Sequence, residues 1–267
     1  MTSATPVREI VVADTVAWLS EDAARRDCSQ WSIVSSIPDA SETGQEDAAW
    51  RRFFVDMARG LMALVPDDGV MVLFQTDLRR DGAWLDKARL CSDGAADAGG
   101  IVVAKKIVCR RPTGTTSSRR AAYTNLLCFA RRPLDTRLPD TVPDVIADAG
   151  PVTWTRGVGL FAARAAMTFV RRYAPMTTTV VDPFCGEGML VAVANEAGFA
   201  AIGVERHGKR AELARRLRIE DIRGAGGAAD DANDDGVSEA EASSLRDAGR
   251  DAKAVGNDRQ RRRHGET

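Results

Sequence analysis

Two acidic residues and two glycines stand at a spacing that suits the binding of a nucleoside. One apolar, β-branched run ends on Asp182, and a second apolar run ends on Glu205. Between them lie the glycines of a tight turn, Gly186 and Gly188, and a helical stretch that begins at Met189. This is the order strand, turn, helix, strand, whose crossover in a parallel sheet is right-handed. The glycines let the backbone pass close to a ligand, and Glu205 is placed to accept from two ribose hydroxyls. The pattern predicts a nucleoside-cofactor site, unless the glycines serve only the turn of an ordinary βαβ unit.

The residue between the two glycines indicates the kind of cofactor. A dinucleotide site has three glycines around a pyrophosphate, whereas this turn has two glycines and an acid, Glu187. We therefore expect a cofactor with a positive centre. The string DPFCGEG, which starts at Asp182, resembles the DPFxGxG motif of class I S-adenosylmethionine (AdoMet) methyltransferases, especially those that act on nucleic acids. The resemblance implies that AdoMet is the cofactor and that Phe184 lies along it.

Polar residues also end apolar runs in the first eighty residues. They are Asp14, the segment 36–39 and the segment 75–77. Because the carboxyl ends of parallel strands meet at one edge of a sheet, these residues are expected to share one crevice with the glycine motif. Too little chain follows that motif to complete a seven-stranded sheet, so the missing strands must precede it.

This arrangement is similar to the circularly permuted order of the β-class amino methyltransferases, over roughly residues 8–217. It implies an α/β, Rossmann-like class I methyltransferase sheet of seven mostly parallel strands with a terminal antiparallel hairpin. The hairpin is expected at 101–109 and 123–129, and 134–151 is expected to be a loop. Helices are expected from the spacing of apolar residues at 15–24, 46–64, 84–92, 154–173 and 189–196.

The resemblance assigns roles to individual cofactor residues. Asp14 matches the acid that contacts the adenine amino group, and it suits the N-cap of the following helix equally well. The residues expected to bind the cofactor are Asp14, Asp182, Phe184, Gly186, Gly188 and Glu205.

The catalytic motif of the family is altered in this chain. Amino methyltransferases have Asp, Asn or Ser, then Pro-Pro, then an aromatic residue that stacks the flipped base. Ser36 and Pro38 fit this pattern, but Ile37 replaces the first proline and Asp39 replaces the aromatic residue. We expect Ser36, Pro38 and Asp39 to be catalytic, with the Asp39 carboxylate removing a proton from a ring nitrogen or orienting a hydroxyl or amine. The alternative is that Asp39 is a loop residue or a helix N-cap.

A basic block indicates the substrate, although the net charge is only -1. Residues 98–134 contain eight basic residues and no acid, and in the loop 110–120 arginines flank a Thr/Ser/Gly segment. Phosphate contact accounts for this pattern, and a merely solvated loop is the alternative. The residues expected to bind the substrate are Gln75, Asp77, Arg110, Arg111, Arg119 and Arg120.

The form of the chain guides the choice of nucleic acid. It has no separate domain for reading duplex DNA, and its amino motif is altered. We therefore expect RNA such as tRNA as the partner, with DNA less favoured, and methyl transfer to a base nitrogen or a hydroxyl. The rival functions are a small-molecule or protein methyltransferase and a degenerate subunit that binds AdoMet or RNA. The modified atom and the oligomeric state are left open.

The composition sets the remaining expectations. A hydrophobic content of 44% supports a full core, and no apolar run approaches the length of about 20 residues that spans a membrane. The start of the chain lacks the features of a signal peptide, and five scattered cysteines with two histidines give no metal-ligand spacing. We expect a cytoplasmic or nuclear protein without a metal or a membrane contact. Residues 1–218 are expected to form the domain, and 219–267 a disordered charged tail.

Overall fold

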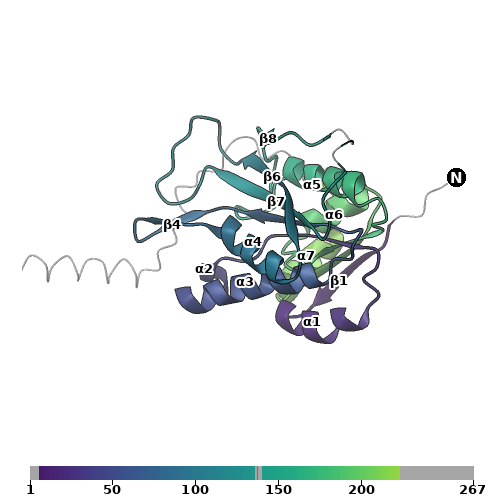
Figure 1. The fold of residues 1–267 in the computed structure, drawn as a ribbon. Helices are drawn as coiled ribbons and strands as arrows, with labels where there is room; N and C mark the ends of the chain where they lie inside the picture. The colour runs from purple at the N-terminus through teal and green to yellow at the C-terminus, as the bar shows by residue number, and fades with distance from the viewer. Residues whose placement is uncertain (1–5, 136, 138–139, 223–267) are drawn as a thin grey trace, which may run out of the picture. The chain divides into compact units, whose positions relative to one another are not determined.

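An eight-stranded sheet forms the centre of the structure, a computed structural model that describes residues 6–135, 137 and 140–222 (Figure 1). In spatial order its strands are β1 (Arg8–Val12), β10 (Ala200–Glu205), β9 (Thr179–Asp182), β2 (Trp31–Ser35), β3 (Met71–Gln75), β7 (Tyr123–Ala130), β6 (Ile101–Cys109) and β8 (Val145–Ile146). The first five strands are parallel to one another, and β7 is antiparallel to both β3 and β6. The predicted α/β sheet with a terminal antiparallel hairpin is therefore confirmed, whereas the circular permutation stays an interpretation. Strand β8, parallel to β6, lies in the segment that was predicted to be a loop.

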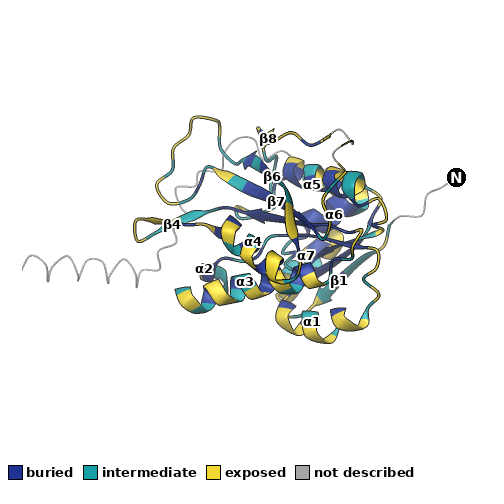
Figure 2. Cartoon of the chain, in the orientation of Figure 1, coloured by how far each residue is buried: buried dark blue, intermediate teal, exposed yellow. Residues whose placement is uncertain are grey.

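Helices cover both faces of the sheet. One face carries α1 (Thr15–Glu21), α3 (Asp47–Ala63) and α4 (Lys87–Asp97), and the other carries α5 (Leu160–Tyr173), α6 (Met189–Glu196) and α7 (Gly208–Arg216). Successive strand residues serve opposite cores, as Ile33 packs with the first set and Val34 with the second. Because both faces are covered, the central strands are buried throughout (Figure 2). Short helical turns complete the fold at η1 (Ala23–Arg25), α2 (Ala40–Thr43) and η2 (Ile219–Asp221).

Two predicted helices begin later than expected. Trp84 lies in β5 (Ala83–Leu85), which pairs with β4 (Leu78–Arg80) in a small separate sheet, and α4 begins only at Lys87. The turn between β4 and β5 is Asp81-Gly82, with positive φ at both residues. An Asp-Gly pair of this kind is a hairpin signal that the helical interpretation of 84–92 overlooked.

The helix predicted at 154–173 begins at Leu160 instead. A Cβ atom at Gly159, the residue before it, would lie only 2.1 Å from the Ala149 carbonyl oxygen. The chain passes Ala149 here as a loop, because only glycine permits so close an approach. Two other helices lie close to their predicted ranges. Helix α3 covers nearly all of the predicted range 46–64, and α1 ends at Glu21 instead of at residue 24.

The folded chain continues a few residues past the predicted boundary at 218. Turn η2 follows it, and Ile219 and Ile222 pack against the core beneath α5, α6 and α7. The rest of the predicted tail lies outside the described residues, so the domain limits stay a prediction. None of the helices in the described part of the chain has the length and apolar character that a membrane span requires.

Candidate active site

The turn after β9 is built around a buried carboxyl group. Asp182 is 2% exposed, and its Oδ1 accepts hydrogen bonds from the Ser35 hydroxyl at 2.6 Å and from the Phe184 N–H at 3.2 Å. Burial raises the pKa of Asp182 to about 7, although both hydrogen bonds favour the charged form. Asp182 therefore changes charge near neutral pH, at the edge of the cavity that it helps to line.

The two glycines of this turn serve different purposes. Gly186 has φ of 53°, and a Cβ atom there would meet only the Trp154 ring nitrogen, at 3.9 Å. Gly188 has φ of 93°, and its Cβ would lie 2.7 Å from the Ala214 Cα of α7. Gly186 thus leaves open space beside the cavity, whereas Gly188 permits the close packing of two helices. Both conformations are left-handed and favour glycine.

Glu205 ends β10, and Asp14 closely follows the neighbouring strand β1, as the expected crevice requires. Strand β1 pairs with β10 so that Val12 is opposite Glu205, and the Ala13 N–H donates to the Glu205 carbonyl at 3.3 Å. The Glu205 side chain is 8% exposed, and its Oε1 accepts from the His207 N–H at 2.8 Å. The Asp14 carboxylate caps α1 by accepting from the Val16 N–H at 2.9 Å, so the N-cap role of Asp14 is present.

These residues line one cavity of about 290 Å³, close to the lower end of the usual size of ligand sites, about 300–1,000 Å³. The cavity lies at the carboxyl ends of β1, β2, β9 and β10. Its walls include the aromatic side chains Phe53, Trp154 and Phe184. Trp154 is held by the Arg210 guanidinium, whose carbon lies 4.7 Å from the ring centre. Acids and arginines both reach the cavity: Asp14, Glu42, Asp182, Glu187, Glu205, Arg156, Arg206 and Arg210.

Ser36 and Pro38 line the same cavity, at the end of β2. The intervening Ile37 is 2% exposed and belongs to the core beneath α3. Backbone carbonyls fix this turn, since that of Pro38 accepts from the Trp50 ring N–H at 3.1 Å and that of Ile37 accepts from the Gln75 amide at 3.4 Å. Gln75, which was predicted to bind the substrate, therefore supports the turn from below and does not line the cavity.

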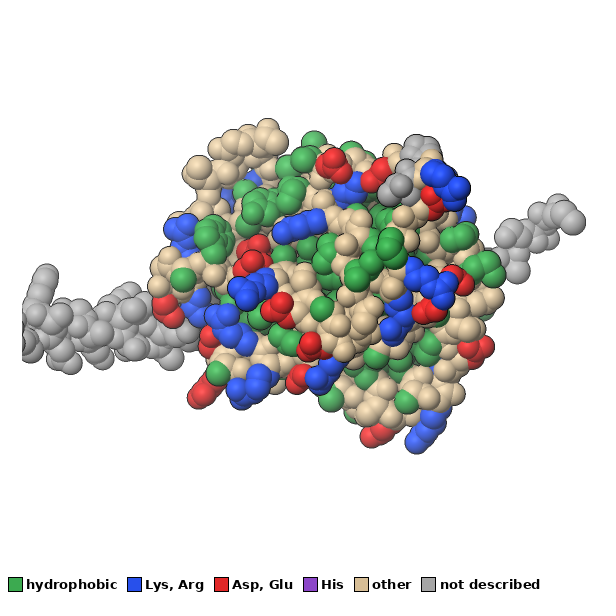
Figure 3. Space-filling view, viewed as in Figure 1, with side chains coloured by type: hydrophobic (Ala, Val, Ile, Leu, Met, Phe, Trp, Pro, Cys, Tyr) green, Lys and Arg blue, Asp and Glu red, His purple; other side chains and the backbone are tan. Residues whose placement is uncertain are grey.

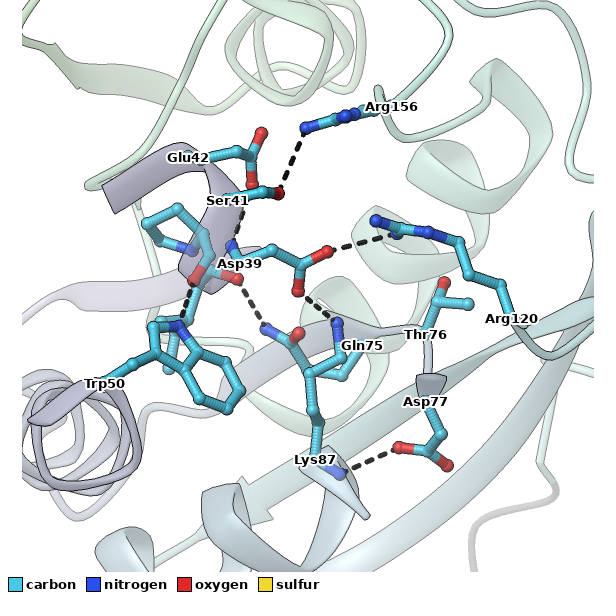
Figure 4. Close-up of polar contacts among 12 residues, drawn as sticks. Asp39, Ser41, Glu42, Trp50, Gln75, Thr76, Asp77, Lys87, Arg120 and Arg156 are labelled. Atoms are coloured by element: carbon cyan, nitrogen blue, oxygen red, sulfur yellow. Dashed lines mark hydrogen bonds and ion pairs between the residues drawn. The ribbon is translucent and has the colours of Figure 1, made fainter. Parts of the chain in front are cut away.

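Asp39 has two cationic partners (Figure 4). The Lys87 ammonium lies 2.6 Å from Oδ1, and the Arg120 guanidinium lies 3.1 Å from Oδ2. Burial would raise the pKa of Asp39, but the two cations outweigh it and lower the pKa below its ordinary value. Asp39 is the N-cap residue of α2, as the alternative interpretation expected, and its own N–H donates to Glu42 Oε2 at 2.8 Å. A carboxylate with a lowered pKa is a weak base, and Asp39 does not line the cavity. Its catalytic role stays a prediction that this geometry does not favour.

The arginines of the predicted substrate loop do not form a single row. Arg120 turns inward to Asp39, while the Arg110 guanidinium donates to the Thr155 carbonyl at 2.9 Å. The Arg119 carbonyl accepts from the Arg79 N–H of β4 at 2.6 Å, and the Arg111 N–H donates to the Ala122 carbonyl at 3.2 Å. Phosphate contact by these arginines stays a prediction. The side chain of Arg120 is already paired with Asp39.

Asp77 was also predicted to bind the substrate, and it connects three elements. Its Oδ1 accepts from the Lys87 N–H at 2.8 Å, and its Oδ2 accepts from the Asn125 amide at 2.9 Å. Asp77 does not line the cavity. The substrate role of Asp77 stays a prediction, and its observed bonds hold the start of α4 against β7.

The sequence interpretation did not identify several residues at this site. Lys87 is 2% exposed, and its role depends on Asp39, 48 residues away. Thr15 follows Asp14 and donates from its hydroxyl to the Pro183 carbonyl at 2.5 Å, which joins α1 to the glycine motif. Arg206 follows Glu205 and donates to the Glu42 carbonyl of α2 at 2.7 Å. Thr15 and Arg206 could have been found from the sequence, because each lies shortly after the end of a strand. No local sequence pattern indicates the role of Lys87.

Comparison with known proteins identifies the fold. No family model and no curated protein matches the sequence. Among solved structures, a "Putative DNA Modification Methylase" from Thermus thermophilus, complexed with S-adenosyl-L-methionine, is 20% identical with a TM-score of 0.59, over 82% of this chain and 96% of that one. The M1.HpyAVI–SAM complex is 14% identical with a TM-score of 0.52, over 79% and 99% of the chains. The cytosine-N4-specific PvuII DNA methyltransferase is 14% identical with a TM-score of 0.56, over 82% and 93%.

The expectation of an RNA partner is wrong by this comparison, because the Thermus thermophilus protein and the PvuII enzyme are named as a DNA methylase and a DNA methyltransferase. The size of the chain was a poor guide to the nucleic acid, since this chain matches 97% of the length of a Thermus thermophilus protein that is named as a DNA modification methylase. The DPFCGEG motif predicted a methyltransferase fold, and the similarity to these solved structures confirms that fold. The chain has the Rossmann-like fold of class I AdoMet-dependent methyltransferases, in the form seen in DNA methylases.

Proposed function

We propose that the protein is an AdoMet-dependent methyltransferase that modifies a base nitrogen in DNA. The observation that carries the proposal is one continuous cavity, which is lined both by the glycine turn with Glu205 and by Ser36 with Pro38. A methyl donor and its acceptor must meet in line for transfer, so a methyltransferase needs both sites in one cavity. The names of two structural neighbours, a DNA modification methylase and a DNA methyltransferase, support DNA as the substrate class.

The residues present fit AdoMet. Glu205 and Asp14 both line the cavity, and we assign Glu205 to the ribose hydroxyls and Asp14 to the adenine amino group. The open side of Gly186 leaves room for the cofactor close to the backbone, with Phe184 forming a wall. Asp182 provides an acceptor for the ammonium group of the cofactor. The bound cofactor supplies an electrophilic methyl group on a positively charged sulfur.

Ser36 and Pro38 are assigned to the acceptor. The Ser36 hydroxyl is at the motif position that accepts from an exocyclic amine, and the Pro38 carbonyl is already fixed by Trp50. Holding the amine nitrogen in line lowers the barrier chiefly by orientation. Asp39 acts here as a positioning residue, because its two cations hold the turn that presents Ser36 and Pro38.

The test is methyl transfer from isotope-labelled AdoMet to unmodified genomic DNA, followed by mass spectrometry of the nucleosides. We expect a methylated cytosine or adenine, and Ser36→Ala should lower kcat by about 10²-fold or more, as for loss of a positioned polar group in an active site. Ser20→Ala is the matched control, because this exposed hydroxyl bonds only to carbonyls of its own helix. AdoMet binding without label in DNA would refute the DNA assignment and favour the small-molecule or protein rival.

A further inference from the structure

A short β-ribbon beside the candidate active site has no role in the function proposed so far. Strands β4 and β5 form a two-stranded sheet of their own. This ribbon projects from the folded domain at the left of the view in Figure 1, where β4 is labelled. The basic loop 110–120 adjoins it, because Leu78 forms a β-bridge with Arg120 and Arg79 bonds to the Arg119 carbonyl. Ribbon and loop together make one projecting element.

The ribbon presents a tryptophan to solvent. Trp84 is 49% exposed, whereas Trp18, Trp31 and Trp50 are at most 5% exposed. The Arg79 guanidinium lies over the Trp84 ring, 4.8 Å from its centre, so a cation holds the ring in place without a hydrophobic pocket. Single exposed apolar side chains are common, and exposure alone would carry no conclusion. The position of Trp84 relative to the acceptor turn distinguishes it from other exposed side chains.

Two ion pairs tie the ribbon to the acceptor turn. Lys87 follows Trp84 by three residues and pairs with Asp39, directly after Pro38. On the other side, Arg120 is bridged to β4 and also pairs with Asp39 (Figure 4). Three residues span at most about 11 Å, so the Trp84 backbone lies within that distance of the Lys87 backbone. The ring is therefore carried by an element that is fixed to the acceptor site.

We propose that Trp84 stacks on a base of duplex DNA when the target base leaves the helix for the cavity. This inference rests on the proposed function and names the element that holds the DNA. A two-stranded ribbon fits the major groove, and an aromatic side chain can stack on the face of a base whose own stacking has been disturbed. Trp84 does not line the cavity, so the proposed contact is with a base that stays in the duplex, and it is separate from the role of the motif aromatic residue, whose position Asp39 occupies.

The charges around the ring suit DNA. The ribbon carries Arg79 and Arg80, and the adjoining loop 110–120 has four arginines and no acid. Arg80 is paired with Asp47 at 2.6 Å, and Asp81 stands at the turn, so the ribbon tip is not uniformly basic. Hydrophobic and basic side chains lie near one another over this end of the molecule, with acidic ones among them (Figure 3). An aromatic ring with flanking arginines provides both stacking and phosphate attraction.

The experiment measures binding to a dye-labelled, random-sequence 30-base-pair duplex by fluorescence anisotropy, with S-adenosylhomocysteine present and over a series of salt concentrations. Trp84→Ala should weaken binding about 5- to 150-fold, the range for loss of one stacked base, without changing the salt dependence. Trp84→Phe should restore most of the affinity. Met176→Ala is the matched control, because this side chain is 57% exposed and precedes β9 at the opposite end of the strand from the cavity.

Separate measurements distinguish the failure of this proposal from failure of the proposed function. Melting curves and AdoMet titrations should be the same for all four proteins. Equal DNA affinity of wild type and Trp84→Ala would overturn the role of Trp84 and leave the methyltransferase assignment intact. A wild-type protein that binds AdoMet but no duplex would overturn both the DNA assignment and the role of Trp84. A protein that binds neither would overturn the proposed function itself.

Discussion

Replacement of Lys87 by methionine tests whether Asp39 is a base or a positioning residue. The change removes the ammonium that lies 2.6 Å from Asp39 and keeps a side chain of similar length. At an effective dielectric constant of about 20, the attraction across this distance is roughly 6 kcal/mol, and desolvation of both groups offsets much of it. Removing one partner of a buried pair costs about 3–5 kcal/mol. Because Arg120 still compensates the other oxygen, we expect the lower end of this range, about 3 kcal/mol.

Urea and thermal unfolding measure this loss. A decrease of about 3 kcal/mol corresponds to a melting temperature lower by about 6–12 °C in a domain of this size. The double variant Lys87→Met/Asp39→Asn should recover part of the loss, because the side chain at position 39 is then uncharged and needs no cation from position 87. The free energy of unfolding should therefore show a coupling between the two positions of about 1–3 kcal/mol. If the two single losses add to within about 0.5 kcal/mol, the pair makes no net contribution and the reasoning fails.

The pH dependence provides a second measurement. The pKa of Asp39 is lowered in the folded protein, so its ion pairs stabilise the fold above the unfolded value of about 3.9. That stability is lost as the pH falls through the lower, folded value. The difference between wild type and Lys87→Met should therefore shrink in acid. If the free energies of unfolding of wild type and Lys87→Met differed by the same amount from pH 7 to pH 2, Asp39 would not be the charged partner of Lys87.

Activity separates the two roles of Asp39. If Asp39 removes a proton, Asp39→Asn should lower kcat by about 10²–10⁴-fold with AdoMet affinity intact, and Lys87→Met should make Asp39 the stronger base. If Asp39 positions the turn, both variants should lower kcat to a similar extent, without a new limb in the pH profile. We expect the second result. A faster Lys87→Met enzyme would restore Asp39 as the base.

Three further predictions concern the cofactor half of the cavity. Glu205→Ala should weaken AdoMet binding by about 1.5–3 kcal/mol, and unchanged affinity by calorimetry would remove the ribose assignment. Gly188→Ala should destabilise the fold by about 1–3 kcal/mol more than Gly186→Ala, because only its Cβ meets Ala214, and equal losses in urea unfolding would contradict this. Because the pKa of Asp182 is about 7, its carboxyl becomes charged as the pH rises through 7, and AdoMet affinity should rise with it. Asp182→Asn should abolish that rise, whereas a wild-type affinity that is flat from about pH 5 to pH 7, where an α-amino group keeps its proton, would argue against an Asp182–ammonium contact.

The cofactor half could be located from sequence because its requirements are local. Positive φ at Gly186 and Gly188 demands glycine, and acids at strand ends are visible as soon as the strands are found. The order of the strands was expected from the resemblance to the β-class amino methyltransferases, because the apolar runs by themselves give only the number of strands. The same local method failed at Trp84, where spacing suggested a helix and the Asp81-Gly82 turn produced a ribbon.

The acceptor half was harder to predict because it depends on contacts between distant residues. Lys87 and Arg120 reach Asp39 from positions 48 and 81 residues further along the chain, and nothing in the local sequence of 36–39 indicates either contact. Without its partners, Asp39 beside the motif was expected to be a base. With them, it is a buried anion whose pKa is lowered.

The altered motif and the ribbon are connected through the ion pairs of Asp39. Ile37 fills the core and cannot be part of an exposed wall, and Asp39 uses its position for the contacts to Lys87 and Arg120. The stacking function is therefore absent at the motif position, yet the same ion pairs fix beside the turn an element that carries an exposed tryptophan. Restoring an aromatic residue at position 39 would remove the anchor of that element. We therefore expect Asp39→Tyr to lower duplex affinity rather than raise it, because Lys87 would be left buried without its carboxylate. Higher duplex affinity in the Asp39→Tyr variant would argue against the ribbon as the element that holds the DNA.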